Sequence, residues 1–247
     1  LDTAENYGDI HEIIGKYHYK NPNKKFRINT KFNPDLKLIQ IEDKITEFLN
    51  DLKVDFIDTI MFHSFESYKN NLSAVKFIEY LKKKGIIKNV GVSVYNNKEI
   101  EYLFNDNRID TVQLPFNLFD NINKRGFYLK RLKDLNKNTQ TRSTFLQGLF
   151  FMDFNKSNNL LKILHNELNF IREISIKNNI SINNLALLYS LSQINIDQVI
   201  IGVDSLNQLK KNIYSLKTDL SINLLNDINS IDILNKNILN PSLWEKI

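Results

Sequence analysis

The chain has 247 residues, of which 42% are hydrophobic and 25% are charged, so it can form a sizeable core and is not disordered as a whole. The formal net charge of +5 arises from 33 basic and 28 acidic residues spread along the chain, which argues against a nucleic acid as the partner. The absence of cysteine excludes disulfides, thiolate metal sites and cysteine nucleophiles, and no apolar run approaches the roughly 20 residues that a membrane-spanning helix needs.

Short β-branched or apolar segments alternate with longer segments in which apolar residues recur every three or four positions. In the first half, this pattern predicts strands at 26–31, 56–62, 89–93 and 111–114, and helices at 38–52, 72–81 and 100–104. Gly85 follows the helix at 72–81 in the position where glycine often ends a helix, because glycine readily adopts a positive φ.

In the second half, the same pattern predicts strands at 139–143 and 198–201, and helices at 128–135, 160–177, 181–191 and 206–216. Ser181 is interpreted as the N-cap of the helix that it begins. Strands that alternate with helices indicate an α/β protein with a parallel sheet. Residues 1–3 are interpreted as the end of one further strand, which brings the count to seven, one fewer than a (β/α)8 barrel contains.

Polar residues stand at the ends of successive predicted strands. They are Asp2, Lys31, His63, Ser93 and Gln113, and Tyr7 follows Asp2 within one short loop. In a (β/α)8 barrel the C-terminal ends of the strands meet at one rim, where residues distant in sequence become neighbours. Each residue also has an ordinary interpretation, such as a capping aspartate, a solvated lysine or a core histidine. Their occurrence together favours a shared site.

These side-chain types suit the reduction of a carbonyl group. A tyrosine hydroxyl with its ordinary pKa of about 10 is a weak acid near neutrality, and an adjacent ammonium group lowers such a pKa. A carboxylate beside the lysine keeps the ammonium charged and oriented, and a histidine can hydrogen-bond to the same substrate oxygen. Because no side chain supplies a hydride, this chemistry requires a cofactor.

Six segments resemble, in order, the motifs of the aldo-keto reductases. Residues 2–8, with the sequence DTAENYG, are similar to the family signature Asp-Thr-Ala-x-x-Tyr-Gly. Residues 30–31, 61–63, 84–93, 112–117 and 200–212 resemble the segments that carry the catalytic lysine, the catalytic histidine and the cofactor contacts. The resemblance extends from residue 1 to about residue 216, and the ordered set is far more specific than any single motif.

The resemblance implies a single (β/α)8 TIM-type barrel domain over residues 1–247. The N-terminal hairpin, first strand and first helix, which the family has before its signature, are lacking from this sequence, so we expect roughly 40 residues to precede Leu1. The implied protein is a cytoplasmic enzyme that uses NADPH or NADH to reduce an aldehyde or ketone, a sugar-related carbonyl being one candidate. We expect a small-molecule carbonyl substrate, a monomer or weak homo-oligomer, and no metal, nucleic acid or membrane.

By the same resemblance, Tyr7 is the proton donor, Asp2 and Lys31 tune it, and His63 orients the substrate carbonyl. The implied cofactor contacts run from the nicotinamide to the adenosine end. They are Ser93, Gln113, Arg142, Ser143, Leu149, Gly202, Ser205, Gln208 and Asn212.

Three residues depart from the family pattern. Val94 replaces an asparagine that contacts the nicotinamide carboxamide, and Arg142 replaces an aromatic ring that stacks on the nicotinamide. Asp204 stands where NADPH-preferring members place cations, and a carboxylate close to a phosphate weakens binding. We therefore expect the chain to tolerate or prefer NADH.

Two alternatives remain. The chain could be a regulatory subunit that binds the cofactor without turnover, or a truncated product without activity. Retention of the proposed acid Tyr7 together with Asp2, Lys31 and His63 favours catalysis, because a binding subunit does not need an acid. Trp244 in the C-terminal tail is interpreted as a packing anchor rather than a substrate contact.

Overall fold

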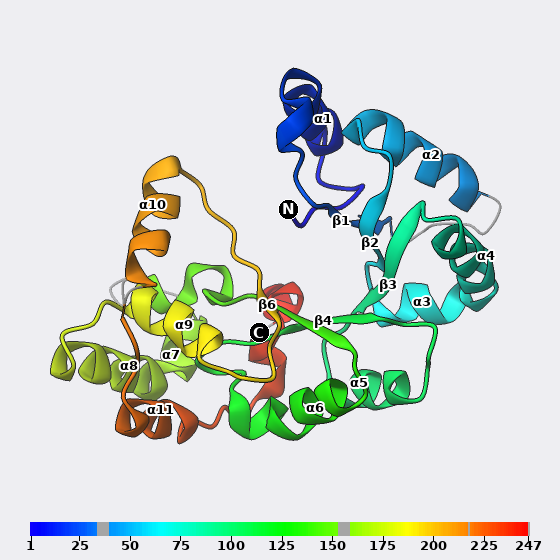
Figure 1. Cartoon of the computed structure of the whole chain (residues 1–247). Helices are drawn as coiled ribbons and strands as arrows, with labels where there is room; N and C mark the ends of the chain where they lie inside the picture. The colour runs from blue at the N-terminus through cyan, green and yellow to red at the C-terminus, as the bar shows by residue number, and fades with distance from the viewer. Residues whose placement is uncertain (34–39, 153–158, 217, 247) are drawn as a thin grey trace. The chain divides into compact units, whose positions relative to one another are not determined.

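The structure is a computed structural model that describes residues 1–33, 40–152, 159–216 and 218–246 (Figure 1). The chain forms two compact units. The first contains Leu1–Gln113 and Leu135–Asn138, and the second contains Leu114–Asp134 and Thr139–Ile247. Among the described residues, no helix combines the length and the apolar character needed to span a membrane.

Six strands form a sheet in the order β1-β2-β3-β4-β5-β6. Their bounds are β1 (Asn29–Phe32), β2 (Ile57–Phe62), β3 (Ile87–Ser93), β4 (Thr111–Pro115), β5 (Asn138–Arg142) and β6 (Gln198–Val199). The pairs β1/β2, β2/β3, β3/β4 and β5/β6 are parallel. The prediction of an α/β protein with a parallel sheet is therefore confirmed, and every residue of β2 is buried, as expected for a strand covered on both faces.

Helices separate the strands. In the first unit they are α1 (Ile10–Lys20), the short 3-10 helix η1 (Pro22–Lys24), α2 (Ile41–Leu52), α3 (Phe65–Asn70), α4 (Leu72–Lys83) and α5 (Asn97–Phe104). Helix α4 ends as predicted, because Gly85 has φ 78° and its N–H donates to the carbonyl oxygen of Lys82. The N–H of Ile86 donates to the carbonyl oxygen of Leu81, which completes a Schellman motif.

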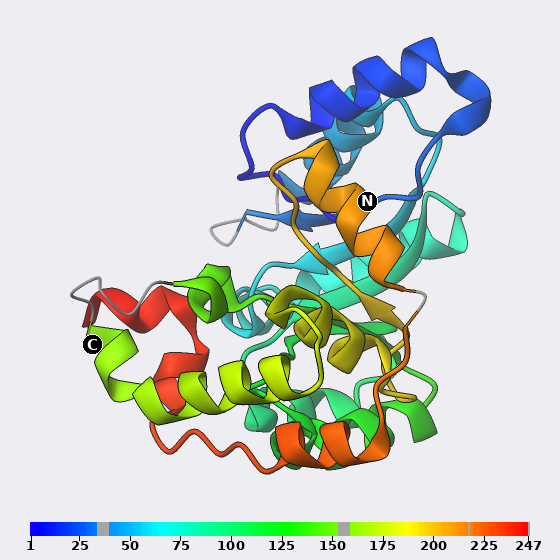
Figure 2. The same ribbon diagram turned by 90° about the vertical axis from the view of Figure 1, so that its left-hand side faces the viewer.

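The second unit is mainly helical. It contains α6 (Ile122–Asp134), η3 (Leu146–Phe151), α7 (Asn159–Ile163), α8 (His165–Lys177), α9 (Ile182–Leu191), α10 (Leu206–Ser215), α11 (Ile222–Asn229), η4 (Lys236–Leu239) and η5 (Pro241–Lys246). Helices α8 and α11 contact each other and lie side by side (Figures 1 and 2). Ser181 caps α9 as predicted, since its hydroxyl accepts the N–H of Asn184. Trp244 donates to the carbonyl oxygen of Ile238, so its indole nitrogen is bonded within the tail.

Several predicted bounds are wrong. The first strand begins at Asn29 rather than at residue 26, because backbone groups before Asn29 bond outside the sheet. The N–H of Ile28 donates to the Asp58 carboxylate, and the N-terminal ammonium group donates to the carbonyl oxygen of Arg27. The predicted helix 160–177 is two helices that meet at Leu164, and the last strand has two residues rather than four. The strand predicted to end at Ser143 ends one residue earlier, since Ser143 has φ 64°. The first residues of the predicted helix 38–52 lie outside the described ranges.

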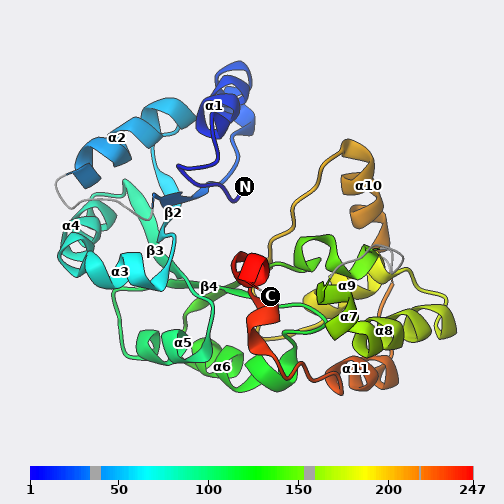
Figure 3. The same cartoon turned by 180° about the vertical axis from the view of Figure 1, so that it is seen from behind.

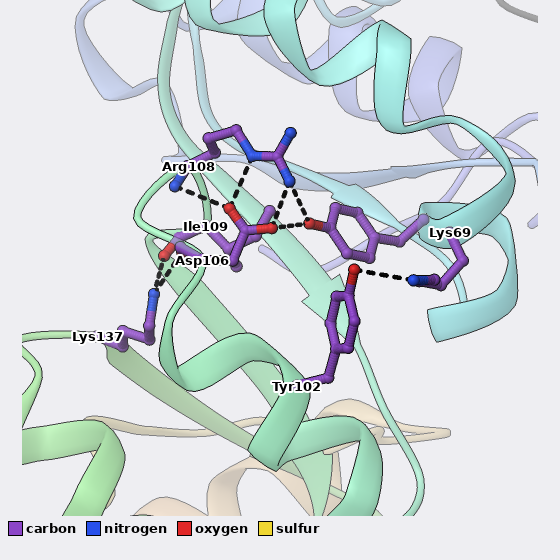
Figure 4. A network of polar contacts seen from close by, with 7 residues as sticks. Lys69, Tyr102, Asp106, Arg108, Ile109 and Lys137 are labelled. Carbon is purple, nitrogen blue, oxygen red and sulfur yellow. Dashed lines mark hydrogen bonds and ion pairs between the residues drawn. The ribbon is translucent and has the colours of Figure 1, made fainter.

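A polar network joins α3 to the segment that precedes β4 (Figure 4). Arg108 forms a two-point ion pair with Asp106 at 2.7 and 2.6 Å, and Tyr68 donates its hydroxyl to Asp106. The hydrogen bonds from Arg108 lower the pKa of Asp106 to about 2, while burial and Asp106 raise the pKa of Tyr68. Lys137, just before β5, donates to the carbonyl oxygens of Asp106 and Ile109. The network thus fastens the N-terminal ends of β4 and β5.

Helices α1 and α2 contact each other closely and lie side by side (Figures 1 and 3). A Cβ atom added to Gly15 of α1 would lie 1.8 Å from the carbonyl oxygen of Asp51 in α2. His18 of α1 lies 2.7 Å, through Nδ1, from the carbonyl oxygen of Leu52, and its Nε2 accepts the N–H of Phe26. Backbone of α2 therefore occupies the space where any larger residue at position 15 would project.

We expect Gly15→Ala to destabilise the protein by about 1–3 kcal/mol, because the helices must separate to admit the methyl group. In an ordinary helix interior the same change stabilises by roughly 0.5–1 kcal/mol, so the two cases differ in sign. Urea denaturation followed by circular dichroism measures the change. Lys16→Ala, at an exposed neighbour on α1, should stay within about 0.5 kcal/mol of wild type. An unchanged or raised stability of Gly15→Ala would contradict the close packing.

His11 on the same helix is buried beside β1. Its Nε2 lies 2.8 Å from the Thr30 hydroxyl and its ring packs edge-on against Phe48 at 4.8 Å. Burial lowers the pKa of His11 below its ordinary value of 6.5, and nearby carboxylates only partly offset this effect. The folded chain therefore takes up a proton at His11 at lower pH than the unfolded chain does.

Because of this difference, His11 favours the folded state fully above pH 6.5, and this contribution is lost as the pH falls below 6.5. We expect the urea midpoint to drop between about pH 7 and pH 5, with a smaller drop in His11→Gln, which keeps a polar group for Thr30. His165→Gln, at an exposed histidine, is the control and should follow wild type. Equal pH slopes in His11→Gln and wild type would exclude this source of acid sensitivity.

Candidate active site

The predicted catalytic residues lie in the first unit, at the C-terminal ends of neighbouring strands. Asp2 forms a parallel bridge with Asn29, which supports its interpretation as the end of a further strand. Lys31 lies in β1 opposite Met61 of β2, and His63 directly follows β2. Ser93, the last residue of β3, lies opposite Gln113 of β4. The sheet register therefore brings these residues to one edge, as the sequence predicts.

The centre of the site is an ion pair between Lys31 and Asp2. The ammonium nitrogen of Lys31 lies 2.6 Å from Oδ2 of Asp2, and it also donates to the carbonyl oxygen of Thr3 at 3.2 Å. The side chain of Lys31 is 3% exposed and that of Asp2 is 14% exposed. Removing either partner would leave the other charge buried without its counter-ion, which destabilises a folded protein strongly.

Gln113 bonds to the second oxygen of the same carboxylate. Its Nε2 donates to Oδ1 of Asp2 at 3.0 Å, and the Gln113 residue is almost fully buried. Both oxygens of Asp2 therefore have a partner. The sequence suggested a cofactor contact for Gln113, and the structure adds this contact to the carboxylate, which strand periodicity alone does not reveal.

Tyr7 and His63 complete the group. The Lys31 nitrogen lies 5.9 Å from the centroid of the Tyr7 ring, and the rings of Tyr7 and His63 meet edge to face with centroids 6.0 Å apart. Tyr7 is 52% exposed, so its phenol stands between the buried ion pair and solvent. The phenol, ammonium, carboxylate and imidazole that were predicted as one site are brought together.

The turn that carries Tyr7 is fixed by Glu5, a residue without a role in the sequence analysis. The N–H of Tyr7 donates to the carbonyl oxygen of Ala4, which closes the turn, and the N–H of Glu5 donates to the carbonyl oxygen of Lys31. The Glu5 carboxylate accepts the N–H of Asn33 at 2.8 Å. The only signal in the sequence is an acidic residue two positions before the tyrosine.

Four of the predicted cofactor residues belong to or precede α10, in the second unit. The Ser205 hydroxyl caps the helix by accepting the N–H of Gln208, and the side-chain oxygen of Gln208 accepts the N–H of Asp204 at 2.7 Å. Asn212 is buried and accepts a hydrogen bond from Asn183 of α9. Gly202 has no atom within 4 Å of an added Cβ. Ser205, Gln208 and Gly202 are exposed in this unit, whereas Asn212 contributes to its packing.

The other predicted cofactor residues of the second unit lie after β5. Arg142 donates to the Ser143 hydroxyl at 3.3 Å, and the carbonyl oxygen of Ser143 accepts from Asn117 at 3.2 Å. Leu149 in η3 is buried, so its side chain belongs to the core rather than to a surface. In the part of the chain that the structure describes, no group of three or more His, Asp or Glu side chains is arranged to hold a metal ion.

Solved structures share this fold. The aldo-keto reductase AKR11C1 from Bacillus halodurans, in its holo form, matches with a TM-score of 0.77 and 20% identity over 94% of this chain and 81% of its own. The aldo-keto reductase MGS-M4 from a Medee basin deep-sea metagenome library matches with a TM-score of 0.72 and 22% identity over 94% of this chain and 80% of its own. At such identities the likeness concerns the fold alone, and it confirms the predicted (β/α)8 barrel class.

Sequence comparisons agree with the structural ones. YqkF of Bacillus subtilis (strain 168), an uncharacterized oxidoreductase, is 25% identical over 182 residues, which is 70% of this chain. The matched region spans 59% of the length of that curated relative. The profile of the aldo/keto reductase family matches residues 1–233, which include every residue of the proposed site. The chain therefore belongs to the aldo/keto reductase family.

Proposed function

We propose that this chain reduces an aldehyde or ketone to an alcohol with a nicotinamide cofactor, and that Tyr7 is the proton donor. The observation that carries the proposal is the buried Lys31–Asp2 pair next to the half-exposed Tyr7 ring and the His63 ring. Membership of an oxidoreductase family supports the general class of reaction. A sugar-related substrate, a cytoplasmic location, a single-domain organisation and a monomer or weak homo-oligomer belong to the same proposal.

Each residue has a distinct part in the proton transfer. The ammonium group of Lys31 stabilises the negative charge that remains when a proton leaves the Tyr7 hydroxyl, and Asp2 keeps that ammonium charged and in place. The proton passes from Tyr7 to the substrate oxygen, which His63 helps to orient. Because Tyr7 is half exposed, water can return a proton to it after each reaction.

The residues present fit a nicotinamide cofactor. Ser93 and Gln113 place a hydroxyl and an amide opposite each other on adjacent strands, and such groups match the donor and acceptor of a carboxamide. Val94 has no polar side-chain atom to offer a carboxamide, and its N–H donates to the carbonyl oxygen of Gln113. When bound, the reduced cofactor supplies the hydride for the carbonyl carbon.

For the rest of the cofactor, the proposed contacts lie in the second unit. The loop that contains Ser143 and Leu149 is proposed to lie along the pyrophosphate, with Arg142 at the position of the stacking ring. Gly202, Ser205, Gln208 and Asn212 are proposed for the adenosine end. The exposure of Gly202, Ser205 and Gln208 around the start of α10 supports the latter assignment for these three residues, because a ligand can reach them.

We expect Tyr7→Phe to lower kcat for carbonyl reduction by about 100-fold or more, because the substrate oxygen loses its acid while the ring is kept. The measurement is cofactor oxidation at about 340 nm with a panel of aldehydes and ketones. Tyr19→Phe, at an exposed tyrosine of α1, is the control and should match wild type. Equal turnover by Tyr7→Phe and wild type would show that Tyr7 is not the acid. Cofactor binding without turnover by wild type would instead favour the regulatory subunit.

Asp204, which directly precedes the N-cap of α10, predicts the cofactor preference. The carboxylate of Asp204 would repel the 2′-phosphate of NADPH, so we expect wild type to bind NADH at least as tightly as NADPH. Asp204→Asn should tighten NADPH binding by about 3–10-fold and leave NADH binding within about twofold. Isothermal titration with both cofactors measures this, and Asp219→Asn, an exposed acidic residue of the same unit, controls for the charge change. A clear NADPH preference in wild type would refute the prediction.

A further inference from the structure

We infer that Glu5 is a positioning residue for Tyr7, and that its carboxylate sets the place of the phenol by holding the Tyr7 turn against the end of β1. The inference rests on the proposed function. In the turn itself, the N–H of Tyr7 donates to the carbonyl oxygen of Ala4 at 3.1 Å. Glu5 is the second residue of this turn, and Gly8 after it has φ 65°, which lets the chain reverse beyond the tyrosine.

Glu5 is attached to the strand at two points. Its N–H donates to the carbonyl oxygen of Lys31 at 3.0 Å, and its carboxylate Oε2 accepts the N–H of Asn33 at 2.8 Å. These partners lie two positions apart on one chain segment. A single bond would let the turn pivot, whereas two bonds fix both its position and its rotation relative to the strand.

A cation on α2 holds the carboxylate from its other side. Oε1 of Glu5 lies 3.0 Å from the ammonium nitrogen of Lys44, and both side chains are largely shielded from solvent. Hydrogen bonds from Lys44 to Glu47 and to Glu5 raise the pKa of Lys44. Glu5 therefore faces a positive charge on one oxygen and a main-chain donor on the other, and these two contacts favour one orientation of the carboxylate.

Lys31 of β1 links the Glu5 contacts to the buried ion pair. The carbonyl oxygen of Lys31 receives the Glu5 N–H, and the ammonium group of Lys31 binds Asp2. The distance from the ammonium to the Tyr7 ring thus depends on how the turn sits on Lys31. A proton donor displaced by about 1 Å can lose roughly 100-fold in rate, so a residue that fixes this distance affects kcat without touching the substrate.

Activity assays of four variants test the inference. Glu5→Ala removes both side-chain contacts and should lower kcat by about 10-fold or more, with KM for the carbonyl and Kd for the cofactor within about threefold of wild type. Glu5→Gln keeps an oxygen for the Asn33 N–H and should retain kcat within about threefold. Lys44→Met keeps the Asn33 contact and should behave like Glu5→Gln. Glu47→Ala is the matched control, because Glu47 also binds Lys44 but does not touch the turn.

A second measurement does not depend on turnover. The protein is labelled with 3-fluorotyrosine, and the Tyr7 signal in the ¹⁹F NMR spectrum is identified by its loss in Tyr7→Phe. We expect Glu5→Ala to shift or broaden this signal, while Glu5→Gln and Glu47→Ala leave it in place. Thermal unfolding of each variant confirms that the comparison is made between folded proteins.

The two measurements separate the possible failures. An unchanged Tyr7 signal in folded Glu5→Ala, or a kcat equal to that of wild type, would overturn the inference about Glu5. Equal impairment of Glu5→Gln and Glu5→Ala would also overturn it, because the bond to Asn33 would then not be the cause. If wild type shows no turnover that depends on Tyr7, the proposed function fails, and the ¹⁹F signal alone decides whether Glu5 positions the ring.

Discussion

The ammonium group of Lys31 lies almost entirely out of solvent, 2.6 Å from the Asp2 carboxylate and beneath the turn that carries Tyr7. Burying two charges costs several kcal/mol each, and their attraction repays this only when further hydrogen bonds satisfy the remaining atoms. Those bonds are present, since Lys31 also donates to Thr3 and the second oxygen of Asp2 accepts from Gln113. A pair of apolar residues would stabilise this place as well or better, so the charges are best understood through the chemistry that they permit.

The parallel sheet explains why these residues meet. Asp2, Lys31, His63 and Gln113 are spread over more than one hundred positions. Lys31, His63 and Gln113 each lie within two residues of the C-terminal end of a strand, and Asp2 pairs with the start of β1. The C-terminal ends of neighbouring parallel strands lie at the same edge of the sheet. A sequence pattern of apolar strands that are followed by polar residues is therefore enough to predict that these four residues lie close together. The approximate strand positions and the residues of the candidate site are predictable for this reason. The turn that follows Asp2 then adds Tyr7, the proposed proton donor, to this edge of the sheet.

Helix α1 and the contacts of Glu5 cannot be predicted from the spacing of apolar residues in the sequence. Helix α1 buries His11, Ile14, Gly15 and His18, and a face made of histidines and glycine does not resemble an apolar stripe. The anchoring role of Glu5 depends on a main-chain N–H after β1, and a backbone donor is the same at every position of a sequence. Tertiary packing determines such contacts. Helix α1 and the contact between Glu5 and Asn33 are therefore visible only in the folded structure.

Two tyrosines of the first unit show how neighbouring charges decide what a phenol can do. Tyr68 donates its hydroxyl to the Asp106 carboxylate, and burial together with this bond raises its pKa. Arg108 lies close to the same hydroxyl, but its charge is already paired with Asp106. A phenol held by a carboxylate keeps its proton, so Tyr68 serves as a structural donor. Tyr7 instead lies beside the ammonium of Lys31, is half exposed to solvent and has its turn bonded to β1, and these are the conditions that the proposed proton donor needs.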